Sequence, residues 1–170
     1  LNRDAPTYLT PYARMFVAAA QQLPALMNAY RTGGGVNWRD FGADMSEGQE
    51  WGNRPTYVNS MADWLASVED LHARLSAGAR VADVGCGGGW SSIAIARAYP
   101  GVTIDGFDLD EPAIERARRN AAEEGLSDRV RFHAVDPAEA GHGEAYDLVA
   151  AFECIHDLPQ PVPVLQTMRA

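Results

Sequence analysis

The chain has 170 residues and a formal net charge of −9, which is enough length for one domain with a sizeable core. Its 14 basic residues are all arginine, against 23 acidic ones. Because there is no lysine, P-loop ATPases, protein kinases and Schiff-base enzymes are excluded. The acidic balance argues against broad nucleic-acid binding and against binding to an anionic membrane surface, which both need clustered basic side chains. No apolar stretch approaches the roughly 18–20 residues of a membrane span, and we predict a cytoplasmic protein.

The cysteines and histidines do not have the spacing of a metal site. Cys86 and Cys154 are far apart in the sequence, and the four histidines are scattered. We therefore predict two free thiols in a reducing compartment, and no metal. The chain starts at Leu1, and its last residues have the pattern of an unfinished helix, so we expect a fragment at both ends.

The first half of the chain has the pattern of helices. Pro11 after a threonine is typical of a helix start, and apolar residues then recur at helical spacing. Pro24 must kink this helix or begin a second one, which the glycines at 33–35 would stop. We expect an ordered loop over residues 36–53, and then a further helix capped by Asn53.

From residue 80 onward, short apolar runs alternate with helical patterns. This alternation predicts a parallel sheet with helical crossovers. The expected strands lie at 81–84, 102–107, 129–135 and 146–152, and the expected helices between them at 91–99 and 111–125. We divide the chain into a helical cap or lid region, residues 1–79, and an α/β core, residues 80–170.

A glycine-rich segment, Asp83-Val84-Gly85-Cys86-Gly87-Gly88-Gly89, joins the first strand to its helix. Glycines let the backbone approach a ligand closely, and the helix start offers N–H groups and a positive dipole to an anion. The dinucleotide fingerprint G-x-G-x-x-G/A would need a small residue at Trp90, which disfavours NAD. The pattern that fits is D-x-G-x-G-x-G. The alternative is a tight turn without a ligand.

With this motif, residues 80–170 resemble the class I S-adenosylmethionine-dependent methyltransferases. The resemblance implies a Rossmann-like, doubly wound parallel sheet and S-adenosyl-L-methionine as the cofactor. The carboxylate of that cofactor suits the helix start, and its ammonium suits an acid such as Asp83. The resemblance also assigns four loop residues to cofactor binding: Gly85, Cys86, Gly87 and Gly89.

Two acids follow the next strands. Asp108 ends the second strand ~20 residues after the loop, where nucleotide-binding folds place an acid on the ribose hydroxyls. Leu109 lies beside it, and Asp110 has the position of a helix N-cap. Asp136 follows the third strand, where an acid of the family accepts a hydrogen bond from the adenine amino group, with Pro137 nearby. As alternatives, Asp108 would be only a helix-start acid, and Asp136 only part of a turn.

The segment after the fourth strand corresponds to the family segment that lies under the cofactor and faces the substrate. Phe152 is its cofactor-side candidate. His156 is a candidate general base that would take a proton from a hydroxyl or amine, and Glu153 is a second candidate. The alternative makes His156 a polar residue at a strand exit without a role as a base.

A second resemblance covers the first half: Arg31 to Trp38, Asp40 to Gly42, and Asn53 to Pro55 look like bacterial methyltransferases that carry a winged-helix domain ahead of this region. In these enzymes that amino-terminal part, which is absent here, usually mediates dimerisation, so a homodimer is a candidate assembly. The aromatic side chains of this half would either form a lid over the site or belong to the core, and we favour the core for most of them. They are Tyr8, Tyr12, Trp38, Trp51 and Tyr57.

We therefore predict methyl transfer to an oxygen, nitrogen or carbon of a small-molecule acceptor, by in-line displacement. Proximity and orientation would be the main catalytic effect. Two alternatives stay open: a non-catalytic cofactor-binding or interaction module, and an NAD-binding oxidoreductase. Only about four strands fit into residues 80–170, so we expect an incomplete core whose fourth strand lies at an edge.

Overall fold

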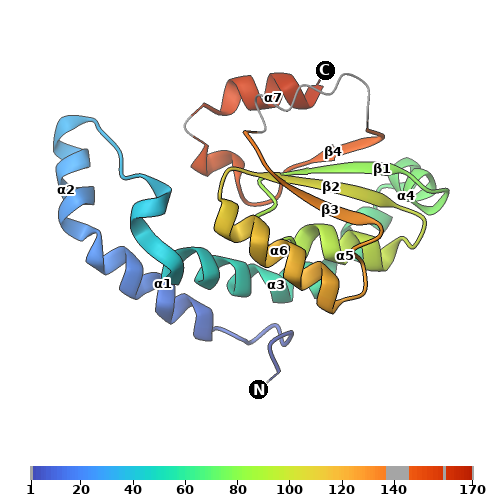
Figure 1. Ribbon diagram of the computed structural model, residues 1–170, viewed down its shortest axis with the longest axis horizontal. Coiled ribbons are helices and arrows are strands. Elements are labelled where there is room, and N and C mark those ends of the chain that lie inside the picture. Colours follow the sequence, from blue (N-terminus) through green and yellow to red (C-terminus); the bar gives the residue numbers. More distant parts are fainter. Residues whose placement is uncertain (1, 137–145, 159, 170) are drawn as a thin grey trace. The chain divides into compact units, whose positions relative to one another are not determined.

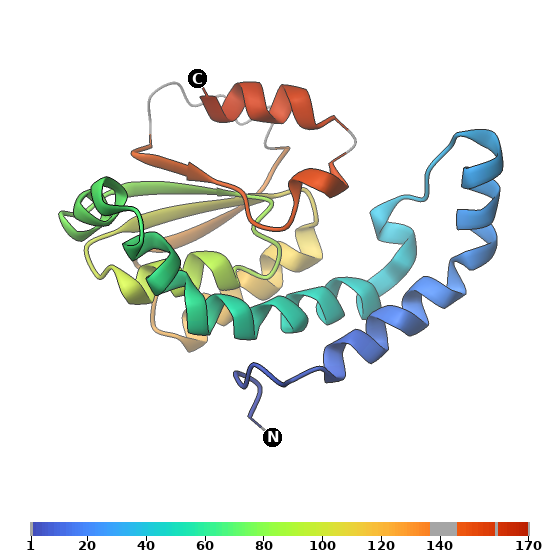
Figure 2. The same ribbon diagram turned by 180° about the vertical axis from the view of Figure 1, so that it is seen from behind.

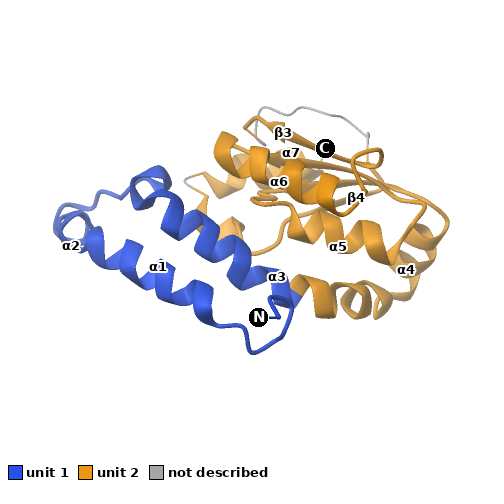
Figure 3. Ribbon diagram, turned by 60° about the horizontal axis from the view of Figure 1, so that its bottom comes forward, with its two compact units in different colours: residues 1–56 blue, residues 57–170 orange. Residues whose placement is uncertain are grey.

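The computed structural model of the protein describes residues 2–136, 146–158 and 160–169. The chain forms two compact units, Leu1–Thr56 and Tyr57–Ala170, which Figure 3 shows in two colours. The division falls inside helix α3 (Gly42–Ala66), so the second unit includes the last turns of that helix. This boundary lies ahead of residue 80, where the sequence places the start of the core, and the functional division into cap and core stays a prediction.

The first unit begins with two helices that confirm the sequence patterns. Helix α1 (Thr10–Gln21) carries Pro11 in its first turn, and helix α2 (Leu23–Thr32) carries Pro24 in its own. Proline is tolerated there because the first helical N–H groups have no partner within the helix. Gly33 then ends α2 in the left-handed conformation, with φ of 76°.

The predicted loop over residues 36–53 is wrong. A short 3-10 helix, η1 (Trp38–Phe41), precedes α3, and Asn53 lies inside α3 rather than at its start. Two glycines that indicate a loop in the sequence instead allow α1 to approach α3 closely. A Cβ atom on Gly48 would lie 2.6 Å from Cγ of Met15, and one on Gly52 would lie 3.3 Å from Cζ of Tyr12.

An ion-pair network also joins α1 to the start of α3. The guanidinium of Arg14 donates to Asp44 at 2.6 Å and to Glu47 at 2.9 Å. These contacts raise the pKa of Arg14, mainly through its hydrogen bonds to the two carboxylates. Two carboxylates at the start of α3 therefore bind the one charged residue of α1.

The second unit is built on a parallel sheet in the order β3-β2-β1-β4 (Figure 1). Its strands are β1 (Arg80–Val84), β2 (Thr103–Asp108), β3 (Val130–Ala134) and β4 (Leu148–Ala150). The register pairs Val81 with Ile104 on one side and with Leu148 on the other. The predicted α/β class is confirmed, and within the described residues β4 lies at an edge, as expected.

Helices lie on both sides of this sheet, as they must when parallel strands bury both faces. Helices α5 and α6 lie on one side and α7 lies on the other, which Figures 1 and 2 show from opposite directions. The helices of this unit, besides the end of α3, are α4 (Glu69–Ser76), α5 (Trp90–Ala98), α6 (Glu111–Glu123), η2 (Ile155–Asp157) and α7 (Pro161–Arg169). The fully buried side chains of Ile93, Ile104 and Ile114 form part of the core between α5, β2 and α6.

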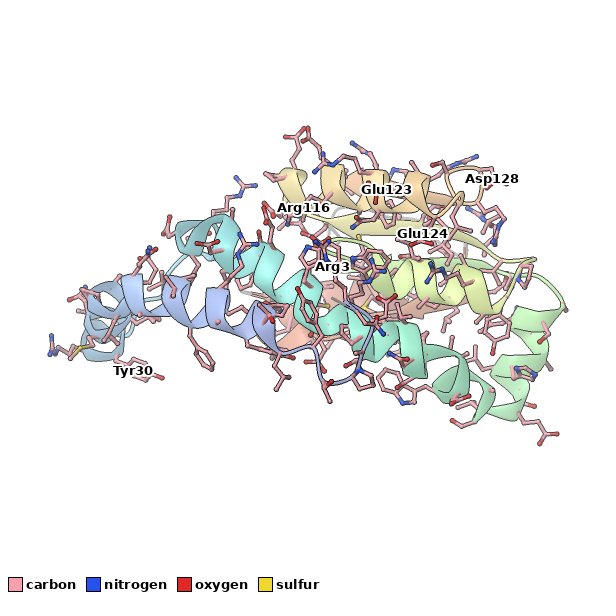
Figure 4. The ribbon with its side chains drawn as sticks, turned by 90° about the horizontal axis from the view of Figure 1, so that it is seen from below. Arg3, Tyr30, Arg116, Glu123, Glu124 and Asp128 are labelled. Carbon is pink, nitrogen blue, oxygen red and sulfur yellow. The ribbon has the colours of Figure 1, made fainter. Side chains whose placement is uncertain are left out.

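The outer side of α6 is charged, as Arg116 and Glu123 in Figure 4 illustrate. The charge pattern of this helix predicts that Arg116, Arg118 and Arg119 all belong to its solvated face. Arg118 instead has a structural role. Its guanidinium donates two hydrogen bonds to the carbonyl of Phe132, at 3.2 and 2.7 Å. Within the described parts of the chain, no helix is both long and apolar enough to cross a bilayer.

Candidate functional site

The glycine-rich segment lies between the end of β1 and the start of α5. Gly85, Gly87 and Gly89 have φ of 72°, 50° and 80°, a region that side-chain-bearing residues seldom adopt. The N–H groups of Gly85 and Cys86 donate to the carbonyl of Phe107 at 2.8 and 3.2 Å, and Gly89 donates to Cys86 at 2.8 Å. The loop is therefore folded back onto the end of β2 through its own amides.

Close packing also requires two of the glycines around this loop. A Cβ atom on Gly89 would lie 2.5 Å from Cζ of Phe132, and one on Gly106 of β2 would lie 2.6 Å from its Cδ1. The ring of Phe132 is buried, with 4% of its surface exposed. It fills the space that the two glycines leave between the sheet and the loop.

Asp83, at the end of β1, is almost completely buried, with 1% of its surface exposed. Its Oδ2 accepts hydrogen bonds from the hydroxyls of Ser91 and Ser92 at 2.5 and 2.6 Å, whereas its Oδ1 has no partner within the described residues. Burial raises the pKa of Asp83 to about 6, although the two serine bonds oppose the rise. A buried acceptor without a donor costs about 1–3 kcal/mol, so this oxygen suits a ligand that brings a donor, such as an ammonium.

Asp108 ends β2 and contacts the glycine loop directly. Its Oδ2 accepts the N–H of Gly87 at 2.9 Å, and its Oδ1 accepts the N–H of Asp110 at 2.9 Å. Burial raises the pKa of Asp108, and its backbone hydrogen bonds oppose that shift. Asp110 precedes the first residue of α6 in the N-cap position, as predicted, but its side chain makes no capping bond. Leu109, between the two acids, is half exposed.

The segment after β4 packs against the end of β1. The thiol of Cys154 donates to the carbonyl of Val84 at 3.2 Å, and a Cβ atom on Gly85 would lie 2.6 Å from its sulfur. The ring of Phe152 meets the ring of Tyr57 edge to face, with 6.0 Å between centroids. Burial raises the pKa of the Cys154 thiol to about 12, which keeps it protonated.

Glu153 has φ of 54°, and it is the only residue other than glycine with positive φ within the described residues. This conformation costs a residue with a Cβ atom about 1–2 kcal/mol. Strain of this kind is concentrated at functional sites, where the surrounding structure enforces it. The strained residue Glu153 therefore lies in the segment after β4, which the sequence assigns to the substrate side.

Two other predicted site residues, His156 and Asp136, lie in η2 and after β3. The side chain of His156, in η2, is 64% exposed, and its Nε2 lies 3.6 Å from Oδ2 of Asp157. Asp136 is partly buried and follows the end of β3. Pro137 lies outside the described residues.

Sequence reasoning missed three polar side chains that support the loop. Ser91 and Ser92 hold Asp83, and the buried amide of Asn120 donates to the carbonyl of Gly88 at 2.8 Å. The signal was present, because adjacent serines start an otherwise apolar helix and one asparagine lies on the apolar face of α6. A polar residue on a buried face needs a partner.

The family follows from comparison with known proteins. A sequence model described as a methyltransferase domain matches residues 75–170, more than half of the chain. The chain belongs to this methyltransferase domain family. The family resemblance drawn from the glycine loop and the acids after the strands is thereby confirmed.

Curated relatives of this chain are named as O-methyltransferases. The domain is 37% identical over 97 residues to a ubiquinone biosynthesis O-methyltransferase of Actinobacillus pleuropneumoniae serotype 5b (strain L20), covering 55% of this chain and 41% of that protein. It is 38% identical over 108 residues to the protein of the same name from Bordetella avium (strain 197N), covering 62% of this chain and 43% of the relative. The chain thus spans about two fifths of the length of these curated relatives.

A solved structure supports the fold over nearly the whole chain. An O-methyltransferase family protein from Burkholderia thailandensis matches 95% of this chain and 49% of its own, with a TM-score of 0.74 and 19% identity. At this identity the likeness concerns the fold alone. The predicted Rossmann-like architecture of the methyltransferase domain is confirmed.

Proposed function

We propose that this methyltransferase domain binds S-adenosyl-L-methionine and that the protein transfers its methyl group to a small-molecule acceptor. The observation that carries the proposal is the unpartnered Oδ1 of Asp83, buried at the end of β1 next to the glycine loop. A ligand with an ammonium group would satisfy this oxygen. Neither a tight turn without a ligand nor the pyrophosphate of a dinucleotide provides such a donor.

We assign the remaining predicted residues to the other parts of the cofactor. We assign the ammonium to Asp83 and the ribose hydroxyls to Asp108, whose two carboxylate oxygens keep lone pairs beyond their backbone bonds. We assign the adenine to Asp136 and Pro137, with Leu109 as an apolar neighbour. We assign the shape of the binding surface to the loop residues Gly85, Cys86, Gly87 and Gly89, and we assign Phe152 to its cofactor side.

When bound, the cofactor supplies a methyl group made electrophilic by a sulfonium. The task of the protein is then to hold donor and acceptor in line and to exclude water. Proximity and orientation can contribute about 7–11 kcal/mol in favourable cases. The names of the relatives favour an oxygen as the accepting atom. If that oxygen must lose a proton, His156 and Glu153 are the candidate bases.

Calorimetry on the full-length gene product, with S-adenosylmethionine, S-adenosylhomocysteine and NAD as separate ligands, tests the cofactor. We expect the first two to bind and NAD not to bind. Binding of NAD alone would favour the oxidoreductase, and failure of all three would refute cofactor binding. A methyl-transfer assay with a library of hydroxyl-bearing acceptors then separates an enzyme from a non-catalytic binding module.

We further propose that residues 1–79 serve as a cap over this core and contribute one or two aromatic side chains to the acceptor side. A homodimer and a location in the cytoplasm also stay predictions. Gel filtration with light scattering on the full-length gene product measures the oligomeric state directly.

A further inference from the structure

The part of α3 that belongs to the second unit has a buried face that includes one polar side chain. Tyr57, Met61 and Leu65 recur every four residues and are all buried, with Tyr57 at 8% exposure. This spacing places them on one face of the helix. Met61 and Leu65 offer no hydrogen-bonding hydroxyl, whereas Tyr57 brings a phenol into the same buried face. A stripe that served packing alone would more simply use phenylalanine at residue 57.

The surroundings of that phenol are acidic. Its ring packs edge to face against Phe152, the residue before Glu153. Burial raises the pKa of Tyr57, and the negative charges of Asp83 and then Glu153 raise it further. The phenol of Tyr57 therefore stays neutral. Of the charges around it, that of Asp83, whose Oδ1 has no partner among the described residues, acts most strongly. The Tyr57 hydroxyl has no hydrogen-bond partner among the described residues.

These observations define which ligand group fits beside Tyr57. A negative potential from two carboxylates repels a carboxylate and attracts a cation. An alkylammonium has three N–H donors, and Oδ1 of Asp83 can accept only part of that set. A neutral phenol oxygen can accept another. Among the described residues, the charges that act most strongly on Tyr57 are those of Asp83 and Glu153.

We propose that Tyr57 is a further binding residue of this site, whose hydroxyl oxygen accepts a hydrogen bond from the same ligand ammonium that Asp83 binds. The inference rests on the proposed function and deepens it. It assigns recognition of the amino-acid end of the cofactor to α3 as well as to the sheet. The phenol then selects for ligands that carry the amino group.

A comparison of two ligands that differ only in the amino group tests this. The probes are S-adenosylhomocysteine and 4-(S-adenosyl)thiobutyrate, its analogue without the amino group, titrated into the full-length gene product. We expect the native protein to prefer S-adenosylhomocysteine. The Tyr57→Phe variant should reduce that preference by on the order of tenfold, because a hydrogen bond to a charged group is lost.

The readout is the ratio of the two affinities, because a partly unfolded variant lowers the active fraction equally for both probes. Met61→Leu is the matched control one turn along the same face, and it should leave the ratio unchanged. An unchanged ratio in Tyr57→Phe, whether or not both affinities fall, would overturn the assignment and leave Tyr57 a core residue. If the native protein binds neither probe, the proposed function itself fails.

Discussion

Asp108 and Gly87 are joined by a hydrogen bond of 2.9 Å from the backbone N–H of the glycine to Oδ2 of the acid. The acid proposed to bind the ribose therefore also holds the glycine loop in place. Its other oxygen accepts the N–H of Asp110, at the start of α6. One carboxylate thus connects the end of β2 to both segments that would surround the nucleoside.

Replacing this carboxylate should weaken cofactor binding through both of its roles. We expect Asp108→Ala to reduce the affinity for S-adenosylhomocysteine by roughly 10- to 100-fold, since bonds to a charged group are lost and the N–H of Gly87 loses its acceptor. Asp110→Asn is the matched control, because the Asp110 side chain makes no capping bond. Isothermal titration calorimetry measures both, and equal affinities in the two variants would remove Asp108 from the site.

The buried carboxyl of Asp83 should make stability depend on pH. Its pKa in the folded protein is raised to about 6, above the ordinary value of 3.8, so the folded state binds the proton more tightly than the unfolded state does. This contribution to stability is present at low pH and is lost as pH rises from about 4 through about 6. A shift of about two pKa units corresponds to about 3 kcal/mol.

The measurement is the free energy of urea unfolding at pH 4.5 and pH 7 in the cofactor-free protein. Asp83→Asn should abolish the part of the decrease in unfolding free energy between pH 4.5 and pH 7 that comes from Asp83. Asp128→Asn, at an exposed residue, should leave that decrease unchanged. S-Adenosylhomocysteine should also release a proton on binding near pH 6, because its ammonium favours the charged carboxylate. Identical pH curves for native protein and Asp83→Asn would refute the shift.

The contact between Gly106 and Phe132 should be intolerant of a methyl group. Gly106→Ala would place Cβ 2.6 Å from the ring and 2.9 Å from the sulfur of Cys86, so we expect a loss of about 1–3 kcal/mol in the free energy of unfolding. Combining it with Phe132→Leu should cost less than the sum of the two single changes. Gly35→Ala, with nothing within 4 Å of the new atom, is the control. Strict additivity would contradict the packing argument.

The strained backbone of Glu153 can be tested with a pair of variants that both lack the carboxylate. Glu153→Gly should be more stable than Glu153→Ala by about 1 kcal/mol, because only glycine adopts φ of 54° without a steric cost. Thermal unfolding measures this difference. If the alanine variant is equally stable, the left-handed conformation carries no strain. The methyl-transfer rates of the two variants then report the role of the carboxylate itself.

The sequence predicted the sheet well because each parallel strand is a short apolar run bounded by turn residues. The alternation of strands and helices leaves few topologies, since crossovers in parallel sheets are right-handed and neighbouring elements stay adjacent. The positions of Asp83 and Asp108 followed from the same logic, because both lie at carboxyl ends of neighbouring strands. Their contacts with serines and with a backbone amide did not follow from it.

The prediction failed at α3, where glycines among aromatic residues suggested a loop and Asn53 suggested a helix start. Gly48 and Gly52 are required by the approach of α1, which no local pattern reveals. Pro55 lies inside the helix, although proline usually ends one. Contacts between segments distant in the sequence decided these residues, and propensity is a weak guide wherever such contacts act.

The glycine loop has a consequence for how fast its amide hydrogens exchange with deuterated solvent. The N–H groups of Gly85, Cys86, Gly87 and Gly89 all donate to acceptors within the protein, before any ligand is bound. These four amides should exchange slowly in the cofactor-free protein and change little when a ligand arrives. The loop therefore has its folded conformation before a ligand binds, and ligand binding costs little conformational entropy in this segment.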